Sequence, residues 1–155
     1  MSKSKRMPEE EFDAFIESLQ EKSFQDVKDA FGEAGFERWR NPKFNGPLKE
    51  ADCHHYLTGK CGDTIQLFLK VEGGQVIDAS YMTNGCASSM LAGSFTAELS
   101  VGNAVEELFS LSPEDVVSKI GKMPDDDRHC ADLAIEVLHE CANSYLISTT
   151  ENSSG

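Results

Sequence analysis

Residues 64–83 place the strongest constraint on the fold, because they have the pattern of two strands joined by a tight turn. Apolar and other residues alternate with a period of two on each side of Gly73-Gly74, a pair typical of hairpin turns. The expected inward face consists of Ile65, Leu67, Leu69 and Val71 in the first strand and Ile77, Ala79 and Tyr81 in the second. An antiparallel hairpin therefore lies near the middle of the chain.

Two helices are expected before the hairpin. Residues 8–22 form an amphipathic pattern, and Ser23 can cap a second helix that ends before Asn41-Pro42. The apolar face of the first helix consists of Phe12, Phe15, Ile16 and Leu19. Residues 41–60 are polar and contain glycine and proline, so we interpret them as an irregular connection.

Helical patterns also follow the hairpin. A helix rich in small residues is expected between Gly85 and Gly102, another begins at Ser112-Pro113, and the last runs over residues 125–146. Helices, a hairpin and more helices indicate an α+β fold, with a small antiparallel sheet packed with helices and an extra N-terminal helix. The expected division is a helical N-terminal extension over 1–30, one domain over 31–147 and a disordered tail over 148–155.

Charge and hydropathy limit the partners of the chain. The net charge of −13 argues against a nucleic-acid surface, which requires a basic stripe. No apolar run approaches the ~20 residues that span a bilayer, and the basic residues 1–6 lack the apolar stretch of a secretory signal. We therefore expect a cytoplasmic protein that contacts neither nucleic acid nor membrane. In such a reducing compartment, cysteines are more often ligands, nucleophiles or core residues than disulfides.

Three short segments place a thiol beside a second potential ligand or a glycine that clears space: Cys61-Gly62-Asp63, Gly85-Cys86 and His129-Cys130. Cys86 and Cys130 fall near the starts of expected helices, where the helix dipole favours a thiolate. Three thiolates with either Asp63 or His129 make a four-ligand set that suits tetrahedral zinc or an iron–sulfur cluster. A carboxylate is a hard ligand for a soft site, so ligation by Asp63 would make a cluster more labile.

The remaining cysteines lie outside these segments. Cys141 belongs to the apolar stripe of the last helix, and at 1.5 Å per residue it is about 16 Å from Cys130. We therefore expect Cys141 to be a core residue. Cys53-His54-His55 has the composition of a ligand cluster, but adjacent histidines in a loop are more often simply exposed, and its role stays open.

Taken together, the segments resemble the IscU or NifU N-terminal-domain family of iron–sulfur cluster assembly scaffold proteins. The matching stretches, in the family's order, are Asn41-Pro42-Lys43-Phe44-Asn45-Gly46, Lys60-Cys61-Gly62-Asp63, Asn84-Gly85-Cys86-Ala87-Ser88-Ser89 and His129-Cys130-Ala131-Asp132-Leu133-Ala134. The resemblance covers residues 31–147 and implies an α/β sandwich. It also implies three cluster-binding, sulfur-accepting cysteines, a carboxylate that keeps the cluster transferable and an additional site residue: Cys61, Cys86, Cys130, Asp63 and His129.

The resemblance implies a scaffold rather than an enzyme. A cysteine desulfurase would supply persulfide sulfur, an iron donor would supply iron, and the transient 2Fe–2S cluster would pass to acceptor apoproteins. The alternative is a zinc-dependent sulfurtransferase with zinc in the same site. That branch carries an insertion between its second and third cysteines and lacks the histidine, so the presence of His129 favours the scaffold. A purely structural zinc domain ranks last, because the core is large enough to survive loss of metal.

The chain departs from the family pattern before His129-Cys130. There the family's chaperone-recognition motif, Leu-Pro-Pro-Val-Lys, is replaced by Met-Pro-Asp-Asp-Asp at residues 123–127. Release of the cluster by a dedicated chaperone is therefore not expected. The helix over 8–22 and Cys53-His54-His55 are further features outside the family pattern.

Overall fold

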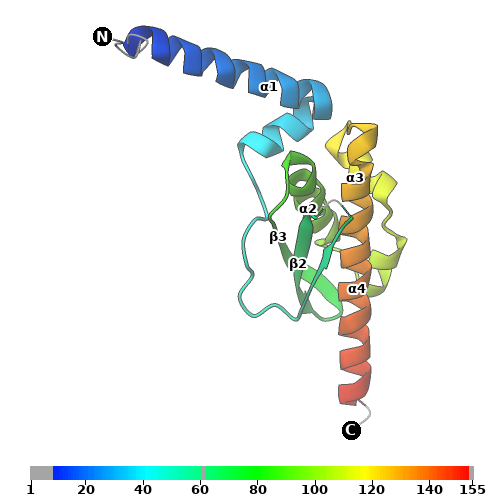
Figure 1. The fold of residues 1–155 in the computed structure, drawn as a ribbon. Helices are drawn as coiled ribbons and strands as arrows, with labels where there is room; N and C mark the ends of the chain where they lie inside the picture. The colour runs from blue at the N-terminus through cyan, green and yellow to red at the C-terminus, as the bar shows by residue number, and fades with distance from the viewer. Residues whose placement is uncertain (1–8, 61, 154–155) are drawn as a thin grey trace.

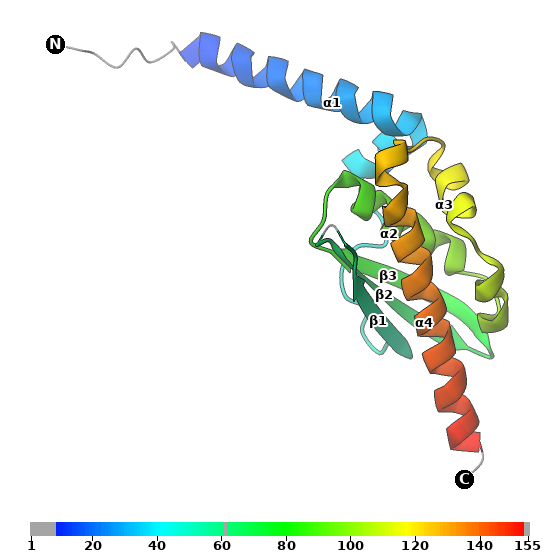
Figure 2. The same ribbon diagram turned by 45° about the vertical axis from the view of Figure 1, so that its right-hand side comes forward.

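The computed structural model describes residues 9–60 and 62–153, and it confirms the α+β class (Figure 1). In chain order the elements are α1 Glu9–Arg40, β1 Cys53–Thr58, β2 Thr64–Glu72, β3 Gln75–Thr83, α2 Ala87–Ser100, the 3₁₀ turn η1 Val105–Ser110, α3 Pro113–Ile120, the 3₁₀ turn η2 Asp125–Asp127 and α4 Arg128–Ser153. The strands form an antiparallel sheet in the order β1-β2-β3. Helix α2 packs on β3, α4 packs on β1 and β2, and the two helices contact each other (Figures 1 and 2).

The predicted hairpin is present, with one change of face. Strands β2 and β3 pair around Gly73-Gly74, and Ile65, Leu67 and Leu69 are fully buried beneath the helices. The register shifts at the end of β2, where Val71 pairs with Val76, which leaves one extra residue in β3. The predicted inward position of Ile77 is therefore wrong: Ile77 is 44% exposed, and Val76 is buried instead.

The connection predicted over residues 41–60 contains a strand that the sequence did not reveal. Strand β1 pairs with β2 along its whole length, from Cys53 opposite Leu69 to Thr58 opposite Thr64. It is an edge strand in which only Cys53 is buried, so it lacks the apolar alternation by which strands are recognised. Its end leads directly into the loop that carries Cys61 and Asp63.

Helix α1 bends at Gly32, and the predicted break at Ser23 is wrong. Gly32 has φ 80° and ψ −177°, a conformation that a glycine adopts without a steric penalty from Cβ. Beyond this bend, Gly35 is buried against Ile120 of α3. Before it, the helix extends away from the sheet (Figures 1 and 2), and its predicted apolar face is exposed.

Helix α4 continues to Ser153, so a disordered tail beginning at residue 148 is wrong for the described residues. The hydroxyls of Thr149 and Thr150 hydrogen-bond to the carbonyl of Leu146, at 3.1 and 2.8 Å. Such back-bonding lets threonines remain in a helix. Within the described part of the chain, no helix has the length and apolar content needed to cross a membrane.

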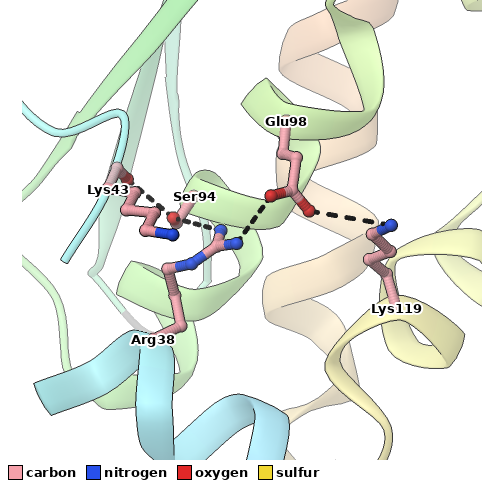
Figure 3. Close-up of polar contacts among 5 residues, drawn as sticks. All are labelled: Arg38, Lys43, Ser94, Glu98 and Lys119. Atoms are coloured by element: carbon pink, nitrogen blue, oxygen red, sulfur yellow. Dashed lines mark hydrogen bonds and ion pairs between the residues drawn. The ribbon is translucent and has the colours of Figure 1, made fainter. Parts of the chain in front are cut away.

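Arg38 fastens the end of α1 to α2 (Figure 3). Its Nη2 lies 2.6 Å from Glu98 Oε1 and its Nη1 donates to Ser94 Oγ at 2.9 Å. Ser94 Oγ in turn donates to the carbonyl of Lys43 at 2.7 Å, and the guanidinium lies 4.1 Å from the centre of the Phe95 ring. One side chain therefore secures both α1 and the segment that follows it.

We expect Arg38→Ala to lower the free energy of unfolding by about 3 kcal/mol, because it leaves Glu98 without its closest cation and removes the ring contact. The matched control is Lys119→Ala. Lys119 Nζ lies 3.9 Å from the other oxygen of Glu98, but its side chain is 51% exposed against 10% for Arg38. It should cost less than ~1 kcal/mol. Urea denaturation measures both, and equal losses would contradict the role of Arg38.

Candidate metal centre

The loop between β1 and β2 presents Asp63 toward the start of α2. Gly59 N–H donates to the carbonyl of Asp63 at 2.9 Å, which closes the loop. Thr64 N–H donates to Asn84 Oδ1 at 2.8 Å, so the beginning of β2 is held against the segment that precedes α2. Cys61 belongs to this loop by sequence but lies outside the described residues.

The carboxylate of Asp63 lies next to two side chains from the beginning of α2. Its Oδ2 accepts a hydrogen bond from Ser89 Oγ at 2.8 Å, and the Sγ of Cys86 lies 3.9 Å away. Ser89 Oγ also lies 3.5 Å from Cys130 Sγ in α4. The structure thus brings Asp63, Cys86 and Cys130 together from separate elements, with the buried Ser89 hydroxyl between Asp63 and Cys130.

Gly85 makes this approach possible. A Cβ at this position would lie 2.6 Å from Ser89 Oγ and 2.8 Å from Asp63 Oδ2, both closer than non-bonded atoms tolerate. The absence of a side chain is therefore a steric requirement of the site. The sequence suggested space beside Cys86 but assigned no role to Ser89, although Ser89 ends the matching stretch that begins at Asn84. The signal for Ser89 was its spacing, because a residue three positions after Cys86 lies on the same side of a helix.

We expect Gly85→Ala to force the Asp63 carboxylate away from Ser89, to lower stability by about 1–3 kcal/mol, and to reduce formation of the cluster that the family resemblance implies. Gly93→Ala is the matched control, since its Cβ would lie 2.7 Å from a carbon of the Tyr81 ring in the core. The control should lose comparable stability but keep cluster formation. Thermal denaturation and visible absorption after reconstitution distinguish the two. A Gly85→Ala protein that assembles cluster normally would contradict the steric role.

The two described cysteines of the site differ in exposure. Cys86 immediately precedes α2, at the positive end of the helix dipole, and is exposed to solvent. Cys130 lies in the first turn of α4 and is 1% exposed. Ser88 Oγ donates to Asp127 Oδ2 at 2.8 Å, so the start of α2 is tied to the turn before α4. This bond keeps the two cysteine-bearing segments adjacent.

His129 lies on the exposed side of α4. Its Nδ1 is 2.9 Å from the carbonyl of Asp126. Because a carbonyl can only accept, Nδ1 carries the proton, and in the neutral ring Nε2 keeps a lone pair for a metal. His129 lines a groove of about 570 Å³ together with Gly59 and Lys60 from the β1–β2 loop. The histidine therefore faces the loop to which Cys61 belongs.

Cys53, His54 and His55 do not converge into a ligand cluster. Cys53 is buried, with its Sγ 3.0 Å from Cys141 Sγ. The ring of His54 stacks on Phe68, with 5.7 Å between the ring centres. Successive residues of a strand point to opposite faces, which separates Cys53 from His54. In residues 9–60 and 62–153, no three Cys, His, Asp or Glu side chains stand at metal-binding spacing. Ligation by Cys61, Cys86, Cys130, Asp63 and His129 stays a prediction.

Comparisons with known proteins found similarity to proteins named for iron–sulfur cluster assembly. Residues 31–152 match the family model described as the NifU-like N terminal domain. "Iron-sulfur cluster assembly scaffold protein IscU 1" of Archaeoglobus fulgidus is 27% identical over 111 residues, which are 71% of this chain and 72% of that protein. "Iron-sulfur cluster assembly enzyme IscU" of Drosophila melanogaster is 30% identical over 116 residues, which are 72% of this chain and 75% of that protein.

The fold has solved counterparts. The N-terminal region of a NifU-like protein from Brucella abortus superposes with a TM-score of 0.60 and 21% identity, covering 77% of this chain and 96% of that one. A protein titled as a SUF-system scaffold from Fervidobacterium islandicum gives a TM-score of 0.58 and 16% identity, covering 71% of this chain and 94% of that one. These similarities show that the sheet and its covering helices have the NifU-like arrangement.

Proposed function

This chain belongs to the NifU-like N-terminal domain family, and we propose on that basis that it is a scaffold for assembling and transferring iron–sulfur clusters. The observation that carries the proposal is the convergence of Asp63, Cys86 and Cys130 at the junction of the β1–β2 loop, α2 and α4. Curated relatives of similar length are named as scaffold proteins for the same process, which supports the role.

We assign binding of a 2Fe–2S cluster to the thiolates of Cys61, Cys86 and Cys130, because thiolates are the protein ligands that such clusters prefer. Asp63 or His129 completes the ligand set. As a hard ligand, the Asp63 carboxylate would weaken the hold on the cluster, whereas His129 would ligate through Nε2 because its Nδ1 bonds to the carbonyl of Asp126. The cluster is cargo, so moderate binding serves the function.

Sulfur arrives from a cysteine desulfurase in this proposal. Cys86 is the exposed thiol of the described site, whereas Cys130 is 1% exposed, so we assign the first sulfur acceptance among described residues to Cys86. Its thiolate attacks the terminal sulfur of the donor's persulfide, the donor S–S bond breaks, and the donor cysteine leaves as a thiolate. Iron comes from an iron donor, and external electrons reduce the bound sulfur to sulfide.

The proposed partners are therefore a cysteine desulfurase, an iron donor and acceptor apoproteins, in the cytoplasm. A dedicated chaperone is not among them. Residues 123–127 contain η2, and Asp127 accepts the hydrogen bond from Ser88. This segment supports the site from within the protein, and it carries aspartates where the family's motif ends in a lysine.

The alternative is a sulfurtransferase that works with a desulfurase while it holds zinc. The proposed ligands support this candidate as well, because three thiolates with one carboxylate or imidazole also suit a tetrahedral zinc ion. In that case zinc would fix the ligands and would stabilise Cys86 as a thiolate for sulfur transfer. The two candidates differ in what the site carries after sulfur has been delivered.

Anaerobic reconstitution with a cysteine desulfurase, ferrous iron and cysteine tests the proposal. We expect visible absorption of a 2Fe–2S cluster, which appears only when all the components are present. The Asp63, Cys86 and Cys130 site fails as a scaffold if no cluster forms while bound zinc persists and desulfurase turnover rises. That result would favour the sulfurtransferase.

A further inference from the structure

Cys53 and Cys141 form a thiol pair that the proposed function does not use. Cys53 belongs to β1 and Cys141 to α4, and their Sγ atoms lie 3.0 Å apart. Because the S–S bond of a disulfide is ~2.05 Å, the two sulfurs need to approach by only about 1 Å to bond. Neither cysteine forms a disulfide in the structure, and both are buried.

The two thiols are not equivalent. The Cys141 S–H donates to the sulfur of Cys53. This hydrogen bond, together with burial and the nearby Cys53, raises the pKa of the Cys141 thiol above its usual value. Cys141 therefore holds its proton while both cysteines are reduced. Cys53 is also the more accessible residue, at 8% exposure on an edge strand against 0% for Cys141.

We propose that Cys53 and Cys141 are a redox modification site that forms a reversible disulfide between β1 and α4, with a low-molecular-weight disulfide as the oxidant. Cys53 gives up its proton and its sulfur attacks the small disulfide, which forms a mixed disulfide and releases one small thiolate. Cys141 then attacks the Cys53 sulfur, and the second small thiolate leaves with the proton of Cys141. The protein thiols lose two electrons, and the small disulfide gains them as two thiols.

A Cys53–Cys141 disulfide would join β1, which leads into the loop of Asp63, to α4, which carries Cys130. The cysteines are 88 positions apart, and closing so long a loop strongly restricts the unfolded chain. Oxidation would therefore stabilise the fold without consuming a site thiol. This inference does not depend on the scaffold role.

A variant with Cys61→Ser, Cys86→Ser and Cys130→Ser tests the proposal, because it keeps only Cys53 and Cys141 of the 5 cysteines. After circular dichroism confirms folding, the protein is incubated with oxidised glutathione. We expect an intact mass lower by two hydrogens, a cross-linked peptide containing both cysteines, and a rise of the thermal midpoint by roughly 10 °C that dithiothreitol reverses.

The control adds Cys141→Ala to this variant and should stop at the glutathione adduct of Cys53, with no rise of the midpoint. The full natural chain, oxidised in the same way and mapped by mass spectrometry, gives a second measurement that does not rely on the triple variant. The proposal is overturned if the folded protein keeps both thiols, if it retains only adducts, or if Cys53 bonds instead to a cysteine of the site.

Discussion

Replacing Cys86 or Cys130 with serine is expected to abolish stable binding of the reconstituted cluster, and the sequence motif predicts the same for Cys61→Ser. A serine hydroxyl has nearly the shape of the thiol but does not supply the soft thiolate that iron–sulfur clusters require. We expect cluster absorbance per protein to fall more than about 10-fold. Loss of a residue that only hydrogen-bonds to a metal ligand already lowers metal affinity by ~10–100-fold, and loss of a ligand itself should cost at least as much. Anaerobic reconstitution followed by desalting measures the retained cluster.

Cys141→Ser is the control for the destabilising effect of placing a serine hydroxyl in the buried core. Cys141 is 0% exposed, so its replacement disturbs the core at least as much as replacement of Cys130, at 1% exposure. If loss of cluster were only a consequence of a weakened fold, both serine variants would lose it. Retention by Cys141→Ser with loss by Cys130→Ser therefore isolates ligation. Full cluster binding by the Cys130→Ser protein would remove this cysteine from the proposed site.

Replacing Asp63 with alanine is expected to make the cluster stay longer and transfer more slowly. The hard carboxylate is the ligand that weakens the proposed site, so its removal should slow donation to an apo-ferredoxin by about 10-fold. The variant is loaded, desalted and mixed with the acceptor, and the rate of appearance of holo-ferredoxin is recorded. Transfer kinetics equal to those of the natural protein would count against this role of Asp63.

Two further variants separate the charge of Asp63 from its placement. Asp63→Asn keeps the shape and can still accept from Ser89, whose Oγ lies 2.8 Å from the carboxylate, but it removes the negative charge. Ser89→Ala keeps the charge and removes the hydrogen bond. If the charge controls release, Asp63→Asn reproduces the slow transfer and Ser89→Ala does not. If placement controls release, Ser89→Ala changes the rate as well.

The hairpin was predictable because burial of one face imposes a period of two, and Ile65, Leu67 and Leu69 are buried as expected. Elements with weaker patterns were missed. Strand β1 is stabilised by pairing with β2 rather than by an apolar face, so its sequence resembles a loop. Capping preference predicts two separate helices with a boundary at Ser23, but the helix continues through Ser23 and bends at Gly32, which lies inside a helical sequence pattern.

The site was partly predictable for a similar reason. Short motifs identified Asp63, Cys86 and Cys130 as chemically notable, but their approach depends on how the β1–β2 loop, α2 and α4 pack. Ser89 was given no role because its spacing from Cys86 places it on the same side of a helix but does not reveal its partners, which are Asp63 at 2.8 Å and Cys130 at 3.5 Å. Likewise, Cys53 was considered with its histidine neighbours, whereas its actual partner is Cys141 on a distant helix.

One measurement examines the scaffold role as a whole: transfer of a cluster built with isotopically labelled iron to apo-ferredoxin, in the presence of an excess of a ferrous-iron chelator. The account predicts that labelled iron appears in ferredoxin as an intact 2Fe–2S cluster, at a rate that the chelator leaves unchanged. Capture of the iron by the chelator, with ferredoxin remaining in its apo form, would contradict it.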